Sequence, residues 1–265
     1  MDFRSDNTHG CSPEIIEALA RVNAGTMSSY GDDEITARVR ERCRDLFACD
    51  LDVFPVLTGT AGNALSIAAM TPSSGSIVCH EEAHIRLEEL GAAQFFTGGA
   101  ALIPLPGVNG ILNAGDLEGI ETFSCLSIAQ TTEAGTIYGV AEVRALCEAA
   151  RAHGARVQMD GSRFANAVAA LGCAPAEITW RAGVDILSFG ATKNGAMAAE
   201  VIVVFRKELA EALVPHWHRS GHRLSKMRFL SAQLDAYFTD DLWLRNARRA
   251  NAAAARLAAG LRPHL

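Results

Sequence analysis

Short apolar runs rich in β-branched residues alternate along this chain with longer stretches in which apolar positions recur at helical spacing. The apolar runs predict strands at 52–57, 76–79, 101–104, 125–129, 155–159, 186–189 and 201–205. The helical spacing predicts helices at 12–23, 35–46, 61–70, 140–153, 209–213 and 242–261. Strands that alternate with crossover helices form a mostly parallel sheet, so the predicted fold class is α/β.

The last predicted helix has a polar start signal. Thr239, Asp240 and Asp241 precede residue 242, and this pattern is typical of an N-cap with acidic residues near the first helical turn. We therefore expect these three residues to cap a helix that is rich in Ala and Arg.

Composition excludes several kinds of partner. The 265 residues include 24 Lys+Arg and 30 Asp+Glu, a formal net charge of −6. No nucleic-acid partner is expected, because binding to the phosphate backbone needs a basic excess. Apolar residues make up 49% and charged residues 20%, so the chain can bury a large core. No membrane partner is expected either, because no apolar run approaches the ~20 residues of a membrane span.

The N-terminus and the cysteines predict a cytoplasmic location. Residues 1–6 are polar and lack the apolar stretch of a secretory signal. The seven cysteines occur singly, without a C-x-x-C pair, and an odd number cannot form a closed set of disulfides. We expect reduced and mostly buried thiols.

The residues after the predicted strands are the first place to look for chemistry, because open α/β sheets bind ligands at the carboxyl ends of their strands. Thr58-Gly59-Thr60 follows the first strand and leads into helix 61–70. Free backbone N–H groups and the helix dipole make such a turn an anion site, although a plain N-cap has the same sequence. Neither G-x-G-x-x-G nor G-x-x-x-x-G-K-S/T occurs, so the predicted phosphate belongs to neither a dinucleotide nor a nucleoside triphosphate.

An acidic residue and a lysine follow two further strands. Asp160-Gly161-Ser162-Arg163 follows the fifth strand, where a local ion pair is the alternative to a functional carboxylate. Lys193 follows the sixth strand among Gly and Ala, with no acidic residue beside it in the sequence. A desolvated lysine becomes an amine nucleophile toward carbonyls, whereas Lys207, between an arginine and a glutamate, suits a solvated loop.

These three strand ends predict a pyridoxal phosphate site. That cofactor needs an anion cradle, a carboxylate that keeps its ring nitrogen protonated, and a lysine that bonds to its aldehyde. The turn at residue 59, Asp160 and Lys193 supply these groups in chain order, the last two 33 residues apart.

The chain also resembles the threonine aldolase family of fold type I pyridoxal phosphate enzymes over nearly its whole length. The similar segments are Phe3-Arg4-Ser5-Asp6-Asn7, Tyr30-Gly31-Asp32-Asp33, Thr58-Gly59-Thr60, Ala83-His84-Ile85, Asp160-Gly161-Ser162-Arg163 and Phe189-Gly190-Ala191-Thr192-Lys193-Asn194-Gly195. Within the family, the stretch 160–230 most resembles phenylserine aldolase. The resemblance implies an aspartate-aminotransferase-like large domain with a mostly parallel central sheet.

The resemblance also implies how the cofactor is held. Lys193 is expected to bond to the cofactor aldehyde and Asp160 to pair with the ring nitrogen. Gly59 and Thr60 are expected to hold the phosphate, and Arg228 to reach the phosphate of a neighbouring subunit. A homodimer or homotetramer with shared active sites is therefore expected.

Three further residues are expected to contact the substrate or the cofactor ring. By the resemblance, Arg163 contacts the ring oxygen or the substrate carboxylate, and Ser5 helps to hold that carboxylate. His84 is expected to stack over the ring and to act as the base or to orient a water molecule, with packing alone as the alternative.

The function implied is cleavage of L-β-hydroxy-α-amino acids, of the phenylserine or threonine type, to glycine and an aldehyde. The alternatives are a β-eliminating lyase or an aminotransferase on the same fold, or a truncated protein that binds pyridoxal phosphate without catalysis. Many threonine aldolases have a second active-site histidine where this chain has Thr132, and this difference favours bulky aromatic β-substituents. A second basic phosphate ligand of the family also lacks a direct counterpart, with His222 or Lys226 as candidate substitutes.

The same resemblance predicts the domain organisation. Residues 1–239 are expected to form the cofactor-binding large domain with an N-terminal arm. Residues 240–265 are expected to form a helix that leads to a missing or truncated C-terminal domain, which in the family supplies an arginine for the substrate carboxylate.

One motif points to a different chemistry. His80-Glu81-Glu82-Ala83-His84 is a literal H-E-x-x-H, the pattern of zinc metalloproteases. That pattern needs both histidines on one helical face, whereas His80 directly follows a predicted strand. No metal site is therefore expected. His216, His218 and His222 lie near two arginines and are more consistent with a basic surface at a phosphate or subunit contact.

Overall fold

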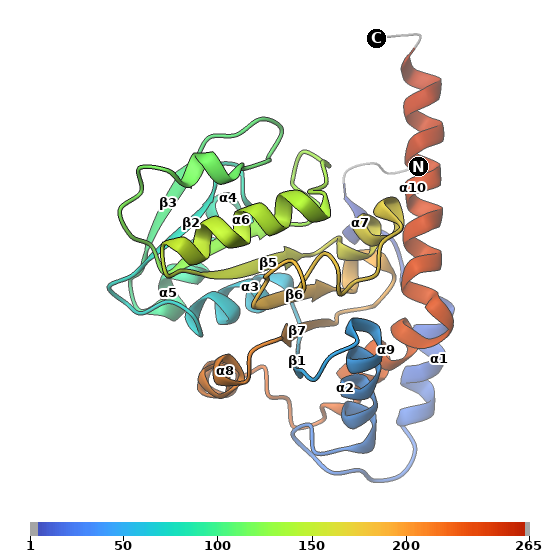
Figure 1. The fold of residues 1–265 in the computed structure, drawn as a ribbon. Coiled ribbons are helices and arrows are strands. Elements are labelled where there is room, and N and C mark those ends of the chain that lie inside the picture. Colours follow the sequence, from blue (N-terminus) through green and yellow to red (C-terminus); the bar gives the residue numbers. More distant parts are fainter. Residues whose placement is uncertain (1–4, 263–265) are drawn as a thin grey trace.

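Seven strands form one sheet in a computed structural model that describes residues 5–262 (Figure 1). They are β1 (Asp52–Val56), β2 (Ser76–His80), β3 (Ala101–Leu105), β4 (Cys125–Ala129), β5 (Arg156–Gly161), β6 (Ile186–Gly190) and β7 (Glu200–Val204). Their order is β1-β7-β6-β5-β4-β2-β3, and every pair is parallel except the two that involve β7. All seven predicted strands are confirmed to within two residues at either end.

Ten α-helices and four short 3-10 helices accompany the sheet in the described part of the chain. The α-helices are α1 (Pro13–Val22), α2 (Glu34–Phe47), α3 (Gly59–Ala68), α4 (His84–Leu87), α5 (Ala92–Thr97), α6 (Val140–Ala152), α7 (Phe164–Leu171), α8 (Lys207–Arg219), α9 (Arg228–Phe238) and α10 (Leu242–Leu261). The 3-10 helices are η1 (Asp6–Thr8), η2 (Ala114–Leu117), η3 (Thr192–Asn194) and η4 (Thr239–Asp241). The six predicted helices are all present, whereas α4, α5, α7 and α9 were not predicted.

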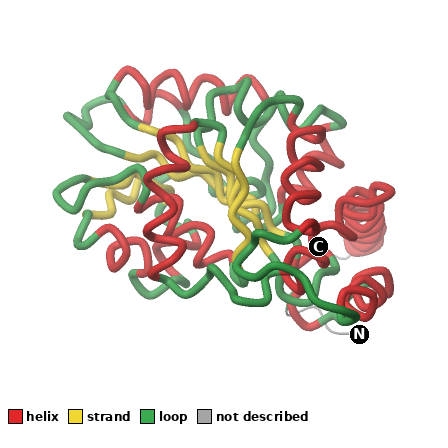
Figure 2. Tube along the Cα trace, turned by 90° about the horizontal axis from the view of Figure 1, so that it is seen from below, coloured by secondary structure: helices red, strands yellow, loops and turns green. Residues whose placement is uncertain are grey.

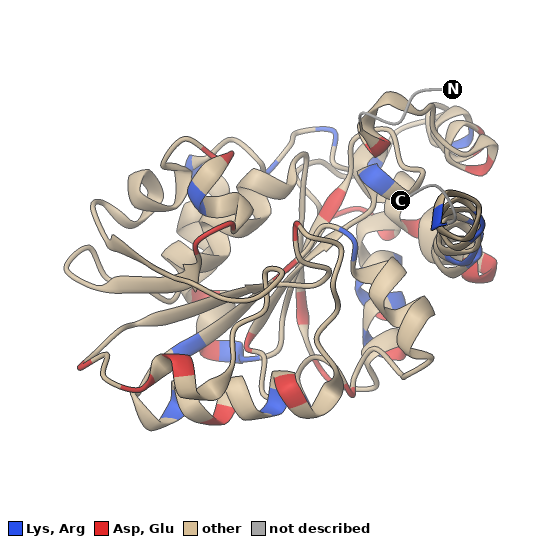
Figure 3. Ribbon diagram, turned by 90° about the horizontal axis from the view of Figure 1, so that it is seen from above, with Lys and Arg blue, Asp and Glu red and all other residues tan. Residues whose placement is uncertain are grey.

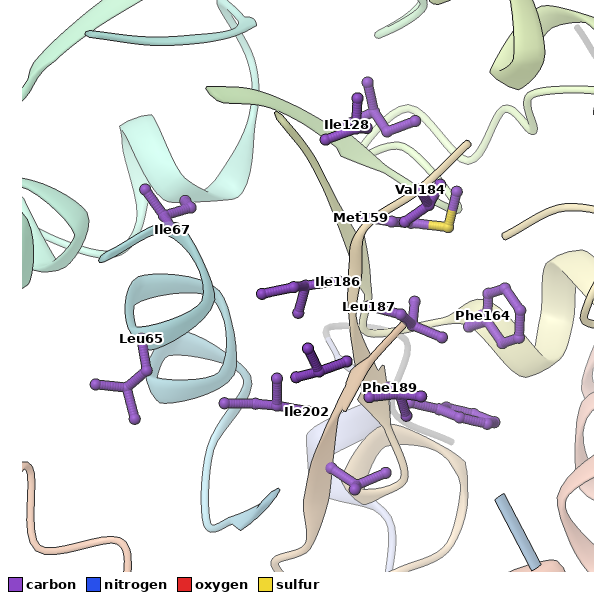
Figure 4. Packing of buried hydrophobic residues seen from close by; sticks show 14 of the residues in the cluster. Leu65, Ile67, Ile128, Met159, Phe164, Val184, Ile186, Leu187, Phe189 and Ile202 are labelled. Carbon is purple, nitrogen blue, oxygen red and sulfur yellow. The ribbon is translucent and has the colours of Figure 1, made fainter. Parts of the chain in front are cut away.

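Helices cover both faces of the sheet, as Figure 2 shows from below. Helix α3 packs on one face against β5 and β6, and α6 and α7 pack on the other. Side chains of each strand alternate between these two layers. In Figure 4, Leu65 of α3 lies on the side of Ile186, while Leu187 points the other way, toward Phe164 of α7. The residues from 61 to 68 in α3 are all buried. The helix that follows the predicted phosphate-binding turn is therefore packed tightly against the sheet.

Helix α10 packs its first turns against α7 and then projects from the rest of the molecule (Figure 1). It begins at Leu242 as predicted, but the predicted capping is wrong. Asp240 and Asp241 have left-handed backbones, with φ of 49° and 54°, and neither side chain caps the helix. They instead turn the chain between α9 and α10. The predicted domain division at residues 239/240 falls in this turn and stays a prediction.

Charged residues lie mainly on the outer helices and loops, with both signs interspersed (Figure 3). No helix in the described residues is both long and apolar enough to span a membrane. A few acidic side chains are nevertheless buried near the sheet, among them Glu89, Asp160, Asp185 and Glu200. Because burying an unpaired carboxylate is costly, these residues indicate where the structure supports specific polar chemistry.

Candidate active site

The predicted phosphate turn lies at the N-terminus of α3. The Thr58 hydroxyl accepts a hydrogen bond from the Ala61 N–H at 3.1 Å, so Thr58 is the N-cap. The Gly59 and Thr60 N–H groups lie in the first helical turn, where no intrahelical acceptor is available. The turn lies next to the end of β5, because a Cβ atom on Gly59 would be 3.6 Å from the Ser162 hydroxyl oxygen.

His222 lies beside this turn and was one of two candidates for an additional phosphate ligand. Its Nδ1 accepts a hydrogen bond from the Leu57 N–H at 3.1 Å. Burial lowers the pKa of His222, and its Nδ1 is used as an acceptor, so the ring is held neutral with Nε2 as its N–H donor. A neutral donor at this position suits a phosphate bound at the helix N-terminus.

Asp160 is the buried acid at the end of β5, 6% exposed. Its Oδ1 accepts hydrogen bonds from the Ser162 N–H at 3.0 Å and the Ser162 hydroxyl at 2.7 Å. Its Oδ2 accepts from the Asn63 side-chain amide at 2.8 Å. Three donors around one carboxyl group stabilise its negative charge. The alternative of a local ion pair with Arg163 is wrong, because Arg163 pairs with Asp6 instead.

His84 and Glu89 form a hydrogen-bonded pair next to Asp160. His84 is the first residue of α4, and its Nδ1 lies 2.9 Å from Oε1 of Glu89. This hydrogen bond raises the pKa of His84, against the lowering effect of partial burial. Burial in turn raises the pKa of Glu89, which is 5% exposed. Polar atoms of His84, Glu89 and Asp160 all lie within 4.8 Å of one another, so the predicted base and the predicted ring partner belong to one cluster of side chains.

The H-E-x-x-H motif does not form the geometry of a zinc site. His80 is the last residue of β2 and His84 the first of α4, so the two rings do not share a helical face. The Nδ1 atom of His80 accepts the Glu82 N–H at 3.0 Å, whereas Nδ1 of His84 bonds Glu89.

Lys193 lies in η3, between β6 and β7. Its side chain is half-buried and makes no hydrogen bond or ion pair with any of residues 5–262. The backbone around it is held on both sides: the Ala191 N–H donates to Glu200 at 3.0 Å, and the Asn194 amide donates to the Tyr237 hydroxyl at 2.6 Å. The amine is therefore unpaired while the turn that carries it is fixed.

An acidic residue that is not adjacent to Lys193 in the sequence lies close to the lysine turn in the fold. Glu200 is buried, its carboxyl accepts a hydrogen bond from the Ala191 N–H, and it is close enough to Lys193 for the two charges to interact. Burial raises the pKa of Glu200 to about 7. The antiparallel register of β7 places Glu200 opposite Gly190, and this pairing cannot be seen from the residues that flank the lysine.

The N-terminal segment brings Ser5 and Arg163 to the same region. Helix η1 packs against η3, which carries Lys193. Arg163 forms an ion pair with Asp6, with Nε 2.8 Å from Oδ2. The Ser5 hydroxyl accepts the Asn7 N–H at 3.2 Å and caps η1. Ser5 and Arg163, which are predicted to contact the substrate carboxylate, thus both lie near Lys193. In this structure the guanidinium of Arg163 is paired with Asp6.

Arg228 and Thr132 lie outside this cluster. The Arg228 guanidinium donates to the Gly25 carbonyl at 3.3 Å and stacks on Phe229, and within residues 5–262 no contact joins it to Asp160, His84 or Lys193. Its role in a neighbouring subunit stays a prediction. Thr132 is buried, and its hydroxyl bonds the Thr136 hydroxyl and the Asn109 carbonyl.

Asn63 and Glu89 were missed by sequence reasoning. Asn63 donates to Glu89 at 2.9 Å and to Asp160 at 2.8 Å. A polar residue within the apolar run 61–70 was an available signal for Asn63. Glu89 follows another glutamate outside every predicted element, so no signal distinguished it from a surface residue.

This cluster fits pyridoxal phosphate in its donor chemistry. Asp160 offers a buried carboxylate for a ring nitrogen. Within residues 5–262, helix α3 also offers unpaired N–H groups for a phosphate and Lys193 an unpaired amine for an aldehyde. The three groups come from one edge of the sheet, at the carboxyl ends of β1, β5 and β6.

Comparison with known proteins agrees with this chemistry. A family model described as beta-eliminating lyase matches residues 2–264. The low-specificity L-threonine aldolase of Pseudomonas aeruginosa is 40% identical over 267 residues, covering 97% of this chain and 77% of that protein. A Leishmania major threonine aldolase structure has a TM-score of 0.91 at 26% identity, covering 98% of this chain and 78% of that one. Aspartate aminotransferase from Thermus thermophilus, at 13% identity, shares the fold alone, with a TM-score of 0.75 over 96% of this chain and 70% of its own.

The fold and the site together define a pyridoxal-phosphate-dependent enzyme of the fold type I class. Within this class, the chain belongs to the threonine aldolase family. It is accordingly a carbon–carbon lyase that depends on pyridoxal phosphate. The predicted fold class, family and cofactor are confirmed.

Glu200 makes the stability of the protein depend on pH. Its carboxyl has a pKa of about 7 in the folded state against an ordinary value of 4.5, so the folded state binds the extra proton. This contribution is fully present below about pH 4.5 and is lost as the pH rises through about 7. Glu200→Gln keeps the acceptor without the charge. Relative to wild type, its free energy of unfolding should therefore rise by roughly 2–3 kcal/mol between pH 5 and pH 8, measured by urea denaturation.

The matched control is Glu208→Gln, because the Glu208 side chain is 61% exposed. Its difference from wild type should stay the same at both pH values. Parallel behaviour of the two variants would contradict the assignment of a buried, protonated Glu200.

Proposed function

We propose that this protein cleaves L-β-hydroxy-α-amino acids to glycine and an aldehyde, and that phenylserine is a better substrate than threonine. The observation that carries the proposal is the His84–Glu89 pair, placed within 4.8 Å of the buried Asp160 carboxylate. Membership of the threonine aldolase family supports the reaction type.

Four residues would hold the cofactor. Lys193 would bond to its aldehyde, and Asp160 would accept a hydrogen bond from its protonated ring nitrogen. The Gly59 and Thr60 N–H groups would bind its phosphate. When bound, pyridoxal phosphate supplies an electron sink that takes up the electron pair of the broken Cα–Cβ bond.

His84 would take the proton from the substrate β-hydroxyl. Its Nδ1 is occupied by Glu89, so Nε2 is the nitrogen available for the transfer. The anionic Glu89 stabilises the positive charge that His84 acquires, and it also fixes the plane of the ring. In this pair, the carboxylate of Glu89 therefore orients His84 as the base.

Arg163 and Ser5 would bind the substrate carboxylate. Arg163 is paired with Asp6, and both side chains are 31% exposed, so the ion pair is open to exchange with an incoming carboxylate. The Ser5 hydroxyl lies on the same N-terminal segment as Asp6 and provides a second donor.

Thr132 supports the preference for an aromatic substrate. Its hydroxyl is already bonded to Thr136 and to the Asn109 carbonyl, so it does not take over a hydrogen bond to the substrate hydroxyl. A threonine is also smaller than the histidine that many family members have there. By the family resemblance this position borders the active site, so the smaller side chain would leave room for a ring on the substrate Cβ.

The cysteines support a cytoplasmic location. All seven are free thiols. Burial raises the pKa of Cys43, Cys125 and Cys147 to about 12, which keeps these thiols protonated and unreactive. Such a set suits a reducing compartment.

Borohydride reduction followed by peptide mapping tests the proposed function. The reduced cofactor should label Lys193 alone among the three lysines, and Lys193→Ala should abolish the label and the release of glycine. Lys207→Ala is the control and should leave both unchanged. Wild-type protein should release glycine and benzaldehyde from phenylserine with a higher kcat/KM than glycine and acetaldehyde from threonine.

Other products would identify the alternatives. Ammonia with a keto acid would indicate β-elimination, and a keto acid with an aminated cofactor would indicate transamination. A labelled Lys193 without any product would indicate a protein that binds the cofactor without catalysis. Each of these results would contradict the aldolase proposal.

We also propose that the protein is a homo-oligomer whose interface borders the active site. Leu87, Leu90 and Phe95 are 50%, 97% and 79% exposed and follow His84 directly in the chain. Leu90 also has a left-handed backbone with φ of 48°, which is unusual for an exposed leucine. Three large apolar side chains exposed within one short stretch of the chain suit an interaction surface, and a second copy of the chain would cover them.

Sedimentation velocity tests this surface. Leu90→Asp combined with Phe95→Ser should convert the oligomer to monomer, because it places a charge and a hydroxyl in the apolar contact. Val108→Asp is the control, because Val108 is equally exposed but lies on another loop. An oligomeric double variant, or a monomeric wild type, would contradict the proposal.

A further inference from the structure

Asn63 makes an unusual pair of contacts inside helix α3. It is 1% exposed, and the residues around it in the helix are apolar or small. Its single side-chain amide group donates to Oε1 of Glu89 at 2.9 Å and to Oδ2 of Asp160 at 2.8 Å. Both amide hydrogens are therefore used on carboxylates that have separate tasks in the proposed reaction.

The orientation of Asn63 is fixed by a chain of buried neighbours. Carboxylates only accept hydrogen bonds, so the amide nitrogen of Asn63 must face them and its oxygen must face away. That oxygen accepts from the Gln158 amide at 3.0 Å. The Gln158 oxygen accepts in turn from the Ser127 hydroxyl at 2.6 Å. Gln158 is fully buried. The two carboxylates therefore fix the orientation of Asn63, and Asn63 in turn fixes that of Gln158.

The contacts have an electrostatic purpose. Two buried carboxylates close to each other repel, so in addition to burial, which is the main cause, the charge of Asp160 raises the pKa of Glu89. The hydrogen bond from Asn63 acts in the opposite direction and lowers the pKa of Glu89. The second carboxyl oxygen of Glu89 has no partner among the described residues, so the loss of Asn63 would leave His84 as the only donor to this group.

We propose that Asn63, held in orientation by Gln158, is a positioning residue that keeps Glu89 an anionic partner of His84 and joins this pair to Asp160. The inference deepens the proposed function and rests on it. Helix α3 thus serves both ends of the site: its first turn faces the phosphate, and its Asn63 sets the charge state of the base.

The sign of the expected effect follows from the groups that face His84. Glu89 and Asp160 raise the pKa of His84, whereas burial and the charge of Lys193 lower it. Without the Asn63 donor, anionic Glu89 is less stable and supports the charged imidazole less well. The pKa of His84 should therefore fall in Asn63→Ala.

Two measurements test this directly. The first is the pH dependence of modification of His84 by diethyl pyrocarbonate, followed by peptide mapping with exposed His218 as the internal reference. The second is the acid limb of kcat/KM for phenylserine cleavage. In Asn63→Ala both midpoints should move to lower pH by about one unit, the scale of one hydrogen bond to a charged group. The kcat value should fall by about tenfold while KM stays within about twofold.

Two further variants separate positioning from folding. Gln158→Met leaves Asn63 in place but removes the donor that orients it, so both midpoints should shift in the same direction by a smaller amount. Asn166→Ala removes an amide that bonds Asn251 and, among the described residues, makes no side-chain hydrogen bond to Glu89, Asp160 or His84, so it should shift neither midpoint. A loss of stability without any shift in the His84 midpoint would mean a structural role and would overturn the inference.

The two proposals fail in different ways. If wild-type protein released no glycine, the proposed function would be wrong, and the modification of His84 would still decide whether Asn63 controls its proton. If wild-type protein were active and the His84 midpoint were the same in Asn63→Ala, only the role of Asn63 would be contradicted.

Discussion

The carboxylate of Asp160 is the constraint on which the site depends. It is buried at the end of a central parallel strand and is kept there by three donors, two from Ser162 and one from Asn63. A buried negative charge is tolerated only when such donors surround it, so the strand end, the following turn and helix α3 must all hold their places. In the proposed function, the protonated ring of pyridoxal phosphate would be the cation that completes this environment.

The other ionisable groups of the site are arranged around this fixed charge. Asn63 donates hydrogen bonds to both Glu89 and Asp160, and Glu89 also bonds His84. One amide therefore connects His84, the proposed base, with Asp160, the proposed partner of the ring nitrogen. Glu200 differs from these two carboxyl groups, because burial raises its pKa to about 7. It also holds the lysine turn by accepting a hydrogen bond from the Ala191 N–H. The site thus combines two carboxyl groups that accept hydrogen bonds from several side chains with one whose burial favours the neutral form.

The sequence was sufficient to predict the sheet and the groups at its edge. Apolar runs mark buried strands, and in an open sheet the residues that follow them must gather at one edge, which brought Asp160, Lys193 and the turn at Gly59 together. The remaining features depend on contacts across the fold. Glu89 lies in the turn between the short helices α4 and α5, which no periodicity marks, and Glu200 arrives through an antiparallel strand register. Neither contact can be predicted from the residues that flank Lys193 or His84 in the sequence.

The central claim is that the buried Asp160 carboxylate binds the ring nitrogen of pyridoxal phosphate. The most direct test is equilibrium dialysis of pyridoxal phosphate against wild-type protein and Asp160→Asn, which keeps the side-chain shape and removes the charge. Loss of a charge-assisted hydrogen bond in a buried site should weaken cofactor binding by at least about tenfold. Equal affinity of the two proteins would show that the acid does not face the cofactor, and the account would be wrong.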